Sequence, residues 1–572
     1  MKPDFKKALA AGAERVAAWA DLLDSINVFP VADGDTGRNM AISLNPLKDD
    51  YESRDELVRE LLLSARGNSG NISAQFFSGF LTGEGVDSLP KAAETGRDMA
   101  YQSVPEPKPG TILTFFDGFV EVLQERKPRE DSHWESVIID RLEQIVRETV
   151  SQLPQLSQAG VVDAGALGMF IFFDGFFNVL VGGNGGMRPI AERFENLIRL
   201  DPSWQGESDS RYCIDAVLEM DDASRERLQS ISDLGEEVVA INGGEYLKVH
   251  LHASDVGEVR RKLEGVANLV RWTSDDMGEQ TQDFLNAPKQ QALHVATDAA
   301  GSVTRADARR LGITLLDSYI TIGKRSVPET HLEPSEMYSA MQEGRAVSTC
   351  QASVFERHQH YQHMLGLYPR VLYLCVGSVF TGNYRTAMDW KATNDPEDRL
   401  IVIDTGAASG RLGLLALATA RFSLETDDAE AVIAYARCAE KRCEEYIFLE
   451  KLQYLAAGGR LSKGSAFFGD VLRMKPVVTP LAEGVIKAGV VRSNAQQIRF
   501  AVDKMERSLQ PDEPALVMLE YSDNIERVKS EILGEIQRRF PACEIFLQPI
   551  SLTSGAHMGP GTWAVSFLPK RI

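Results

Sequence analysis

Apolar residues in the first third of the chain recur at three- and four-residue steps, the spacing of one face of a helix. The first such series is Val16, Trp19, Leu22, Leu23 and Ile26. Similar series follow at 55–65, 85–103, 112–126, 134–152 and 164–181. These patterns predict a helical domain over residues 1–195. The last series is the most apolar, but it contains Asp174, so we expect a buried helix there and not a membrane span.

Further along the chain the pattern changes to the alternation of apolar and polar residues that is typical of half-buried strands. Residues 201–210 are polar and turn-rich, which indicates a linker. After this linker the order strand, helix, strand, strand, helix, strand predicts a small α+β domain at 205–285. From 291 to 572, short apolar strands end in Asp, Ser or Gly before helices, which predicts a parallel α/β domain.

Composition narrows the classes of partner. The chain has 572 residues, of which 44% are hydrophobic and 25% charged, with a formal net charge of −21. This acidic balance argues against a nucleic-acid partner or a standing contact with an anionic membrane. The six cysteines form no CxxC pair, and the first residues lack an apolar core of signal-peptide length. We therefore expect a cytoplasmic protein without a disulfide framework.

The densest candidate chemistry is the segment NVFPVADGDTGRNM at 27–40. Asp33 and Asp35 flank a glycine just before a predicted helix, and two carboxylates at this spacing can converge on Mg²⁺. Thr36 and Gly37 begin that helix, whose free N–H groups favour phosphate oxygens. An Asp-Gly turn with an Asp cap is the ordinary alternative.

Three more segments carry phosphate-binding features. ARGNSGN (65–71) and VVDAGALG (161–168) are glycine-bearing turns at helix starts, and PGTILT (109–114) places the Thr111 hydroxyl at another. Backbone amides in such turns can surround phosphates. The pattern GxxxxGK[ST] does not occur in the sequence, so this is not a P-loop site.

These four motifs, in this order, resemble the nucleotide-binding, DhaL-like domain of dihydroxyacetone kinases, in the form found in the kinase subunit of bacterial fatty acid kinase. The resemblance implies an eight-helix barrel with Mg-ATP at one end. Asp33 and Asp35 would ligate Mg²⁺, and Asn27 lies nearest the family's third metal-binding aspartate. The implied nucleotide-binding residues are Asn27, Thr36, Gly37, Gly67, Asn68, Ser69, Gly70, Thr111, Asp163, Ala164 and Gly165.

Cys213, His250 and His252 are the candidate ligands of the middle domain. The two histidines stand at i and i+2, so on a strand they point to the same face. One thiolate and two imidazoles suit Zn²⁺ with an open fourth position, whereas a buried cysteine beside two unrelated histidines is the alternative. The segment resembles the middle domain of the fatty acid kinase protein, which implies a metal-binding or active-site role for the trio.

In the third domain, hydroxyls, a histidine and an arginine gather in short segments at strand ends. The segments are HVATDAAGSV, AVSTCQAS, CVGSVFTGNY, LAAGGRLS and GAHMGPGTW. In this order they resemble the DegV family of fatty-acid-binding proteins over 291–572, which implies a two-lobed α/β domain. By position, Thr349 and Ser378 would bind the fatty acid carboxylate with His557 beside them. Arg460 and Arg492 would lie at the mouth, where they would either draw in the kinase domain or neutralise the transferring phosphoryl group.

Together the three resemblances predict a multidomain enzyme that uses Mg-ATP to phosphorylate the carboxylate of a fatty acid, giving an acyl phosphate and ADP. The alternatives are a kinase of a small polyol or ketone, a non-catalytic lipid-binding or lipid-sensing protein, and a hydrolase built on the middle-domain trio. We expect ATP and fatty acid as ligands, transient contact with a membrane or an acyltransferase, and a homodimer.

Overall fold

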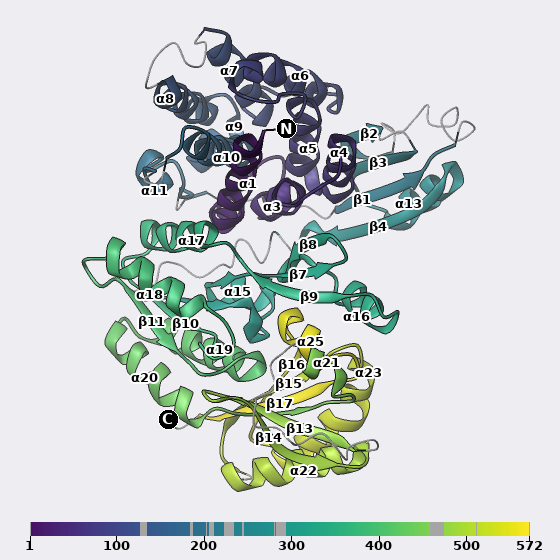
Figure 1. Ribbon diagram of the computed structural model, residues 1–572, viewed down its shortest axis with the longest axis vertical. Helices are drawn as coiled ribbons and strands as arrows, with labels where there is room; N and C mark the ends of the chain where they lie inside the picture. Colours follow the sequence, from purple (N-terminus) through teal and green to yellow (C-terminus); the bar gives the residue numbers. More distant parts are fainter. Residues whose placement is uncertain are drawn as a thin grey trace. The chain divides into compact units, whose positions relative to one another are not determined.

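The computed structural model describes most of the chain (Figure 1). The described residues are 2–125, 134–183, 187–201, 203–204, 211–221, 234–242, 245–278, 281, 293–457, 474–510 and 512–570. They form two compact units, Met1–Asn286 and Ala287–Ile572, and each unit is considered by itself. The boundary between them falls at the start of the polar stretch 286–291.

The N-terminal part of the first unit is helical, as the periodicity predicts. Its helices are α1 (Pro3–Ala18), α2 (Ala20–Ser25), α3 (Thr36–Leu44), α4 (Arg54–Ser64), α5 (Gly67–Phe80), α6 (Leu89–Gln102), α7 (Ile112–Glu125), α8 (Trp134–Glu148), α9 (Pro154–Ala159), α10 (Ala164–Leu180) and α11 (Ile190–Arg193). Successive contacts run from α1 through α3, α5, α6, α7, α8 and α10 back to α1, so the helices close on themselves around one core.

Phenylalanine side chains fill this helical core. Phe76 of α5 stacks on Phe116 of α7 with ring centroids 4.1 Å apart, and Phe119 lies 4.1 Å from Phe173 of α10. Helix α10 is buried over nearly its whole length, and its Asp174 forms a 2.7 Å ion pair with the buried Arg15. Among the described residues, no helix has the length and apolarity needed to cross a bilayer. The expectation of a buried helix at 164–181 is therefore confirmed.

The middle domain is an antiparallel sheet whose strands are ordered β2-β3-β1-β4. The elements are β1 (Tyr212–Glu219), β2 (Glu236–Asn242), β3 (Tyr246–Ala253), α13 (Val256–Val266) and β4 (Asn268–Asp276). This matches the predicted order, except that the first predicted helix lies outside the described residues. Helix α13 lies on one face of the sheet (Figure 1), and its Leu263 belongs to the same buried apolar cluster as Ile214 and Val249. Because side chains alternate along a strand, residues 213, 215, 248, 250 and 252 lie on the opposite face.

The second unit begins with the predicted α/β pattern. Its first elements are β5 (His294–Asp298), α15 (Arg305–Leu311), β6 (Ile313–Leu316), β7 (Ser318–Ile322), β8 (Arg325–Pro328), α16 (Pro334–Gln342), β9 (Val347–Gln351), α17 (Val354–Leu367), β10 (Val371–Cys375), α18 (Asn383–Asn394), β11 (Leu400–Asp404), α19 (Ser409–Glu425) and α20 (Ala429–Arg442). The strands β11-β10-β5-β6 form a parallel sheet, and β8-β7-β9 form a small antiparallel one.

The rest of the unit builds a six-stranded mixed sheet of order β14-β13-β12-β17-β15-β16. Its elements are β12 (Glu444–Phe448), α21 (Gln453–Ala457), β13 (Lys475–Leu481), β14 (Gly484–Val491), α22 (Asn494–Ser508), β15 (Ala515–Tyr521), α23 (Ile525–Arg527), α24 (Gly534–Arg539), β16 (Glu544–Pro549), α25 (Leu552–Met558) and β17 (Trp563–Pro569). Helix α19 contacts β5 of the parallel sheet and β15 and β17 of the mixed sheet. The predicted multidomain fold, with a helical first domain, a small middle domain and an α/β third domain, is confirmed.

Candidate functional site

Two buried carboxylates lie in the loop between α2 and α3. Asp33 is 7% exposed and Asp35 is 8% exposed, and the Asn27 side-chain amide donates to Asp33 Oδ1 at 2.5 Å. Burial raises the pKa of the Asp33 carboxyl well above its usual range, and the neighbouring charge of Asp35 raises it further. A divalent cation would relieve this crowding of carboxylates, and the oxygen donors suit Mg²⁺.

Two N–H groups in the first turn of α3, where the sequence suggested free donors, are already used. The N–H groups of Gly37 and Arg38 donate to Asp24 Oδ1 at 2.7 and 3.1 Å, so a side chain of α2 caps this helix. Gly37 also permits close packing, because a β-carbon there would lie 2.1 Å from the Ala20 carbonyl oxygen. Asp24 was missed because nothing in its sequence surroundings marks it as the cap of a helix that begins twelve residues later.

Helix α5, which follows the predicted phosphate turn, is capped from the middle domain. The Gly67 N–H donates to Asp215 Oδ2 at 3.2 Å, and the Asn71 side-chain amide donates to Asp215 Oδ1 at 3.3 Å. The N–H of Gly67 is therefore not free for phosphate. A β-carbon at Gly70 would lie 2.2 Å from Ser43 Oγ, which explains this glycine by the packing of α5 on α3.

Four predicted nucleotide residues line one cavity of about 1340 Å³, a volume that includes space open to solvent. They are Asn68, Ser69, Thr111 and Asp163. Asp163 Oδ1 accepts a hydrogen bond from the Ala166 N–H at 2.7 Å, so it caps α10. Burial raises the pKa of Asp163 to about 7, although hydrogen bonds from the N–H groups of Ala166 and Gly165 act to lower it. Ala164 and Gly165 follow Asp163 as the first two residues of α10.

The second wall of the same cavity comes from the middle domain. Residues 235–239, at the start of β2, line it opposite the loops of the helical domain. Phe29, Glu106 and Lys108 also line this cavity. Sequence reasoning missed Lys108 and the β2 residues, because no motif marks them.

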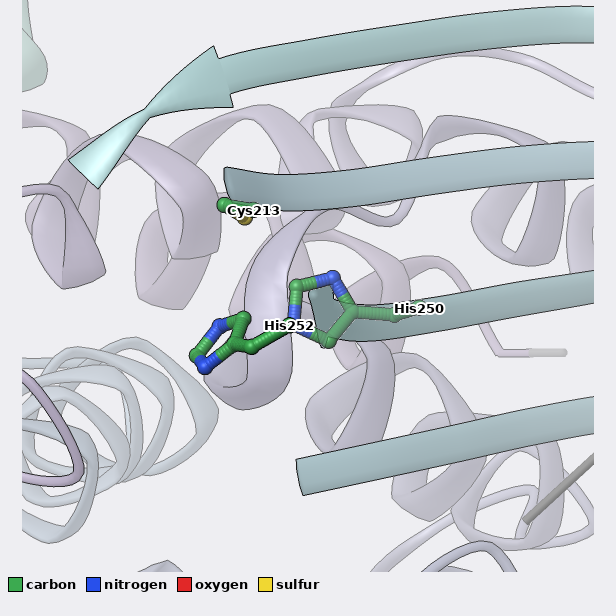
Figure 2. A group of neighbouring side chains, drawn as sticks. All are labelled: Cys213, His250 and His252. Atoms are coloured by element: carbon green, nitrogen blue, oxygen red, sulfur yellow. The ribbon is translucent and has the colours of Figure 1, made fainter. Parts of the chain in front are cut away.

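Cys213, His250 and His252 come together as predicted. Figure 2 shows the three side chains beside one another on neighbouring strands, where Cys213 of β1 pairs with His252 of β3. All three are buried, and one ligand atom from each lies within 4.8 Å of the other two. A tetrahedral zinc ion would hold such atoms about 3.4–3.6 Å apart, so small side-chain rotations would complete the site.

The electrostatics of the trio favour a bound cation. Both ring nitrogens of His250 are buried without a hydrogen-bond partner among the described residues, although Nδ1 lies 3.3 Å from Asp215 Oδ1. Burial raises the pKa of the Cys213 thiol, and the charges of Asp215, Asp35 and Asp33 raise it further. Cys213 thus lies within electrostatic reach of the predicted magnesium ligands, and a metal would be needed to hold it as a thiolate.

Two more charged residues share this face of the sheet. Although burial acts to raise the pKa of Asp215, its contacts with His250, Lys248 and the Gly67 N–H outweigh burial and lower it. Burial lowers the pKa of Lys248 to about 7, which Asp215 partly opposes. Both residues stand two positions from a member of the trio, so the period-two rule was the signal that could have found them.

In the second unit, the structure brings Thr349 and His557 together. Thr349 Oγ1 of β9 lies 3.1 Å from His557 Nε2 of α25. His557 lines an apolar cavity together with Thr381, Thr553 and Ser554. The remaining lining residues are apolar, with Ala300, Val376, Phe380, Ala408, Ile447, Leu455, Val478, Pro480, Val485 and Met558. Such a lining suits an apolar chain.

The other predicted residues of this domain have different positions. Ser378 is exposed on the loop after β10, where its N–H donates to Asp404 Oδ1 at 3.0 Å. Arg492 directly follows β14, whereas Val485, near the start of that strand, lines the cavity. Seven residues of extended strand span roughly 20 Å, which separates Arg492 from Val485 along the strand, and the place of Arg492 at the mouth stays a prediction. Arg460 lies outside the described residues.

Family models match three consecutive parts of the chain. A DAK2 domain matches residues 30–178, the FakA-like middle domain of fatty acid kinase matches 209–284, and an "uncharacterised protein, DegV family" model matches 292–570. These matches agree with the three resemblances expected from the sequence.

Curated relatives match the chain in part. Protein YloV of Bacillus subtilis is 28% identical over 357 residues, which cover 57% of this chain and 64% of that protein. An uncharacterized protein of Staphylococcus saprophyticus is 27% identical over 330 residues, which cover 53% of this chain and 60% of that protein. The chain therefore spans less than two thirds of the length of these relatives.

Two solved structures are similar to about half of the chain. A DegV family protein from Thermus thermophilus, described for its fatty acid binding, has a TM-score of 0.44 and 23% identity, covering 48% of this chain and 99% of its own. DegV of Bacillus subtilis, a fatty acid binding protein, has a TM-score of 0.45 and 18% identity. The match covers 49% of this chain and 100% of that protein.

Proposed function

Because the chain joins a DAK2 domain, a FakA-like middle domain and a DegV-family domain, we propose that it phosphorylates the carboxylate of a fatty acid with ATP. The presence of kinase-type and DegV-type domains in one chain is the observation that carries this proposal. The first unit would bind Mg-ATP, and the second would hold the fatty acid. The expected products are an acyl phosphate and ADP.

The helical domain supports a nucleotide site. Asp33 and Asp35 are the oxygen donors that would hold Mg²⁺, which when bound would neutralise charge on the phosphates. Asn68 and Ser69 at the start of α5 would contact the phosphates from the cavity wall, and Thr111 would add a hydroxyl. With Gly67 capped by Asp215, the turn is held in a fixed position before nucleotide arrives.

The reaction needs positioning more than acid–base chemistry. A fatty acid carboxylate is already ionised at neutral pH, because its pKa is near ~4–5, as for other carboxyl groups. One carboxylate oxygen would attack the γ-phosphorus while the bond to the β–γ bridging oxygen breaks, and ADP would leave with that electron pair. No proton has to move. The work of the protein is to align the two groups and to stabilise the negative charge.

The second unit supports the acceptor role. Thr349 and His557 form a polar pair at an apolar cavity, so a carboxylate head could accept hydrogen bonds there while its tail remains dry. Ser378 on the neighbouring loop would donate a further hydrogen bond. Holding the tail in a protein cavity also removes a poorly soluble chain from water, which favours binding by the hydrophobic effect.

In the middle domain, we propose that Cys213, His250 and His252 bind one zinc ion. The buried nitrogens of His250, which lack hydrogen-bond partners among the described residues, support this assignment. Three ligands leave one open coordination position. Asp215 would orient His250 while it caps α5, so the zinc ligands and the nucleotide turn would be held by one carboxylate.

A hydroxamate assay tests the proposed reaction. Purified protein is mixed with Mg-ATP, a long-chain fatty acid and hydroxylamine, which converts an acyl phosphate to a stable hydroxamate. We expect product from the natural protein and none from Asp33→Asn. The matched control is Asp21→Asn, an equal change at an exposed position of α2, which should retain activity. Absence of hydroxamate from natural protein that holds both ligands would refute the proposal.

A further inference from the structure

The nucleotide cavity contains more negative than positive charge. The described residues that line it include the carboxylates of Glu106, Glu236 and Glu237, together with Asp163, whereas Lys108 is the one cation among them. A nucleotide brings several negative charges of its own, and charge-assisted hydrogen bonds from cations are the strong contacts to phosphate. Of the described side chains that line this cavity, Lys108 is therefore the one suited to neutralise a phosphate.

In the structure, Lys108 already forms an ion pair with a carboxylate of the middle domain. Its Nζ lies 2.9 Å from Glu237 Oε1, across 129 residues of sequence. The same ammonium group lies 5.3 Å from the centroid of the Phe29 ring, so it stands at the rim of the cavity. The two side chains are partly exposed, at 43% for Lys108 and 30% for Glu237, so water can replace either partner.

The backbone of β2 is distorted where it presents Glu237. Along β2, Glu236 pairs with His252 and Val239 with His250, so one extra residue is inserted opposite β3. Glu237 has a φ of 51°, in the left-handed region that a side chain with a β-carbon disfavours. A bulge of this kind redirects a side chain, and bulges and such backbone strain gather at functional sites. Here the redirected side chain reaches Lys108.

We propose that Lys108 is a phosphate-binding residue and that Glu237 competes with the nucleotide for it. Nucleotide entry would exchange the ion pair between domains for an ion pair between Lys108 and the ligand. The inference rests on the proposed nucleotide site, and it adds that a carboxylate of the middle domain competes with the nucleotide for Lys108.

The test is the affinity of a fluorescent ATP analogue, measured with Mg²⁺ on the full chain. Glu237→Gln removes the competing charge at nearly constant size, and an exposed ion pair is weak, so we expect binding about two- to five-fold tighter. Lys108→Met should weaken binding about ten-fold or more. In the double variant, Glu237→Gln should have no further effect, because its competitor role needs Lys108.

Glu236→Gln is the matched control. Glu236 lines the same cavity on the same strand, but its carboxylate pairs with Arg211 and not with Lys108. Its loss removes one negative charge from the rim and should change affinity less than Glu237→Gln does. The inference is overturned if the two Gln variants behave alike, if Glu237→Gln weakens binding, or if its effect persists in the Lys108→Met background. Natural protein that binds no nucleotide would overturn the proposed function as well.

Discussion

The buried carboxyl of Asp163, in the wall of the cavity, gives a prediction that can be tested without turnover. It caps α10 from the cavity wall and is 6% exposed. Burial raises its pKa to about 7, whereas the same carboxyl in an unfolded chain has a pKa of about 3.9. Between pH 4 and 7, the folded protein therefore retains a proton that the unfolded chain has lost.

This difference fixes the sign of the pH dependence. Because the folded state binds more protons in this window, the free energy of unfolding falls as pH rises, and the full loss is reached above pH 7. A shift of about three units corresponds to roughly 4 kcal/mol, an upper value because the cavity admits water. Asn keeps an acceptor for the Ala166 N–H and does not ionise. We expect Asp163→Asn to be more stable than the natural protein by about 2–4 kcal/mol at pH 8, and nearly equal at pH 4.

Hydrogen exchange of peptides from α10 is measured at increasing urea concentrations at each pH. It reports the opening of this helix separately from the unfolding of the second unit. Comparison at equal pH cancels the intrinsic exchange rates. Asp255→Asn is the matched control, because Asp255 caps α13 in the same unit but is exposed. That control should change stability by a few tenths of a kcal/mol at every pH, as exposed substitutions do. An Asp163→Asn protein that is less stable at pH 8, or that retains the natural pH slope, would refute the reasoning.

Three further outcomes are expected. Asp24→Ala removes the acceptor for the first N–H groups of α3 and should lower unfolding free energy by about 1–2 kcal/mol in a denaturant titration, whereas an unchanged midpoint would contradict the capping role. His250→Ala should lower zinc from one ion per chain to none by elemental mass spectrometry, and zinc retained in this variant would rule out the trio. Thr349→Ala combined with Ser378→Ala should weaken fatty acid binding about ten- to thirty-fold in a displacement assay, from two lost hydrogen bonds of about 1 kcal/mol each. Equal affinity would show that these hydroxyls do not hold the head.

Periodicity and local spacing predicted the features that depend on neighbouring residues. The helical face of the first domain, the strands around Cys213 and His250, and the parallel strands of the third domain all follow from short-range patterns. The i, i+2 spacing of His250 and His252 was enough to place both on one face of a strand. To predict that Cys213 lies beside the two histidines, one long-range assumption was needed, the pairing of β1 with β3.

Contacts between distant segments could not be predicted in the same way. Asp215 caps a helix that begins 148 residues earlier, and Glu237 reaches a lysine 129 residues away. Neither residue has a local signature, because capping and ion pairing depend on where another segment folds. For the same reason the sequence did not show that the N–H groups of Gly37 and Gly67 are each used by a carboxylate from another element. Arg492 was assigned by resemblance, directly follows β14, and its role stays a prediction.

The most direct test of the proposed reaction follows an oxygen atom. A fatty acid carrying oxygen-18 at both carboxyl positions is incubated with the protein, Mg-ATP and hydroxylamine, and the released phosphate is analysed by mass spectrometry. If a carboxylate oxygen attacks the γ-phosphorus, that oxygen becomes the bridge of the acyl phosphate and leaves with phosphate when hydroxylamine attacks the carbonyl. The proposal predicts phosphate with one oxygen-18 atom. Unlabelled phosphate formed at the rate of ATP consumption would show that the phosphoryl group goes to water or to another acceptor.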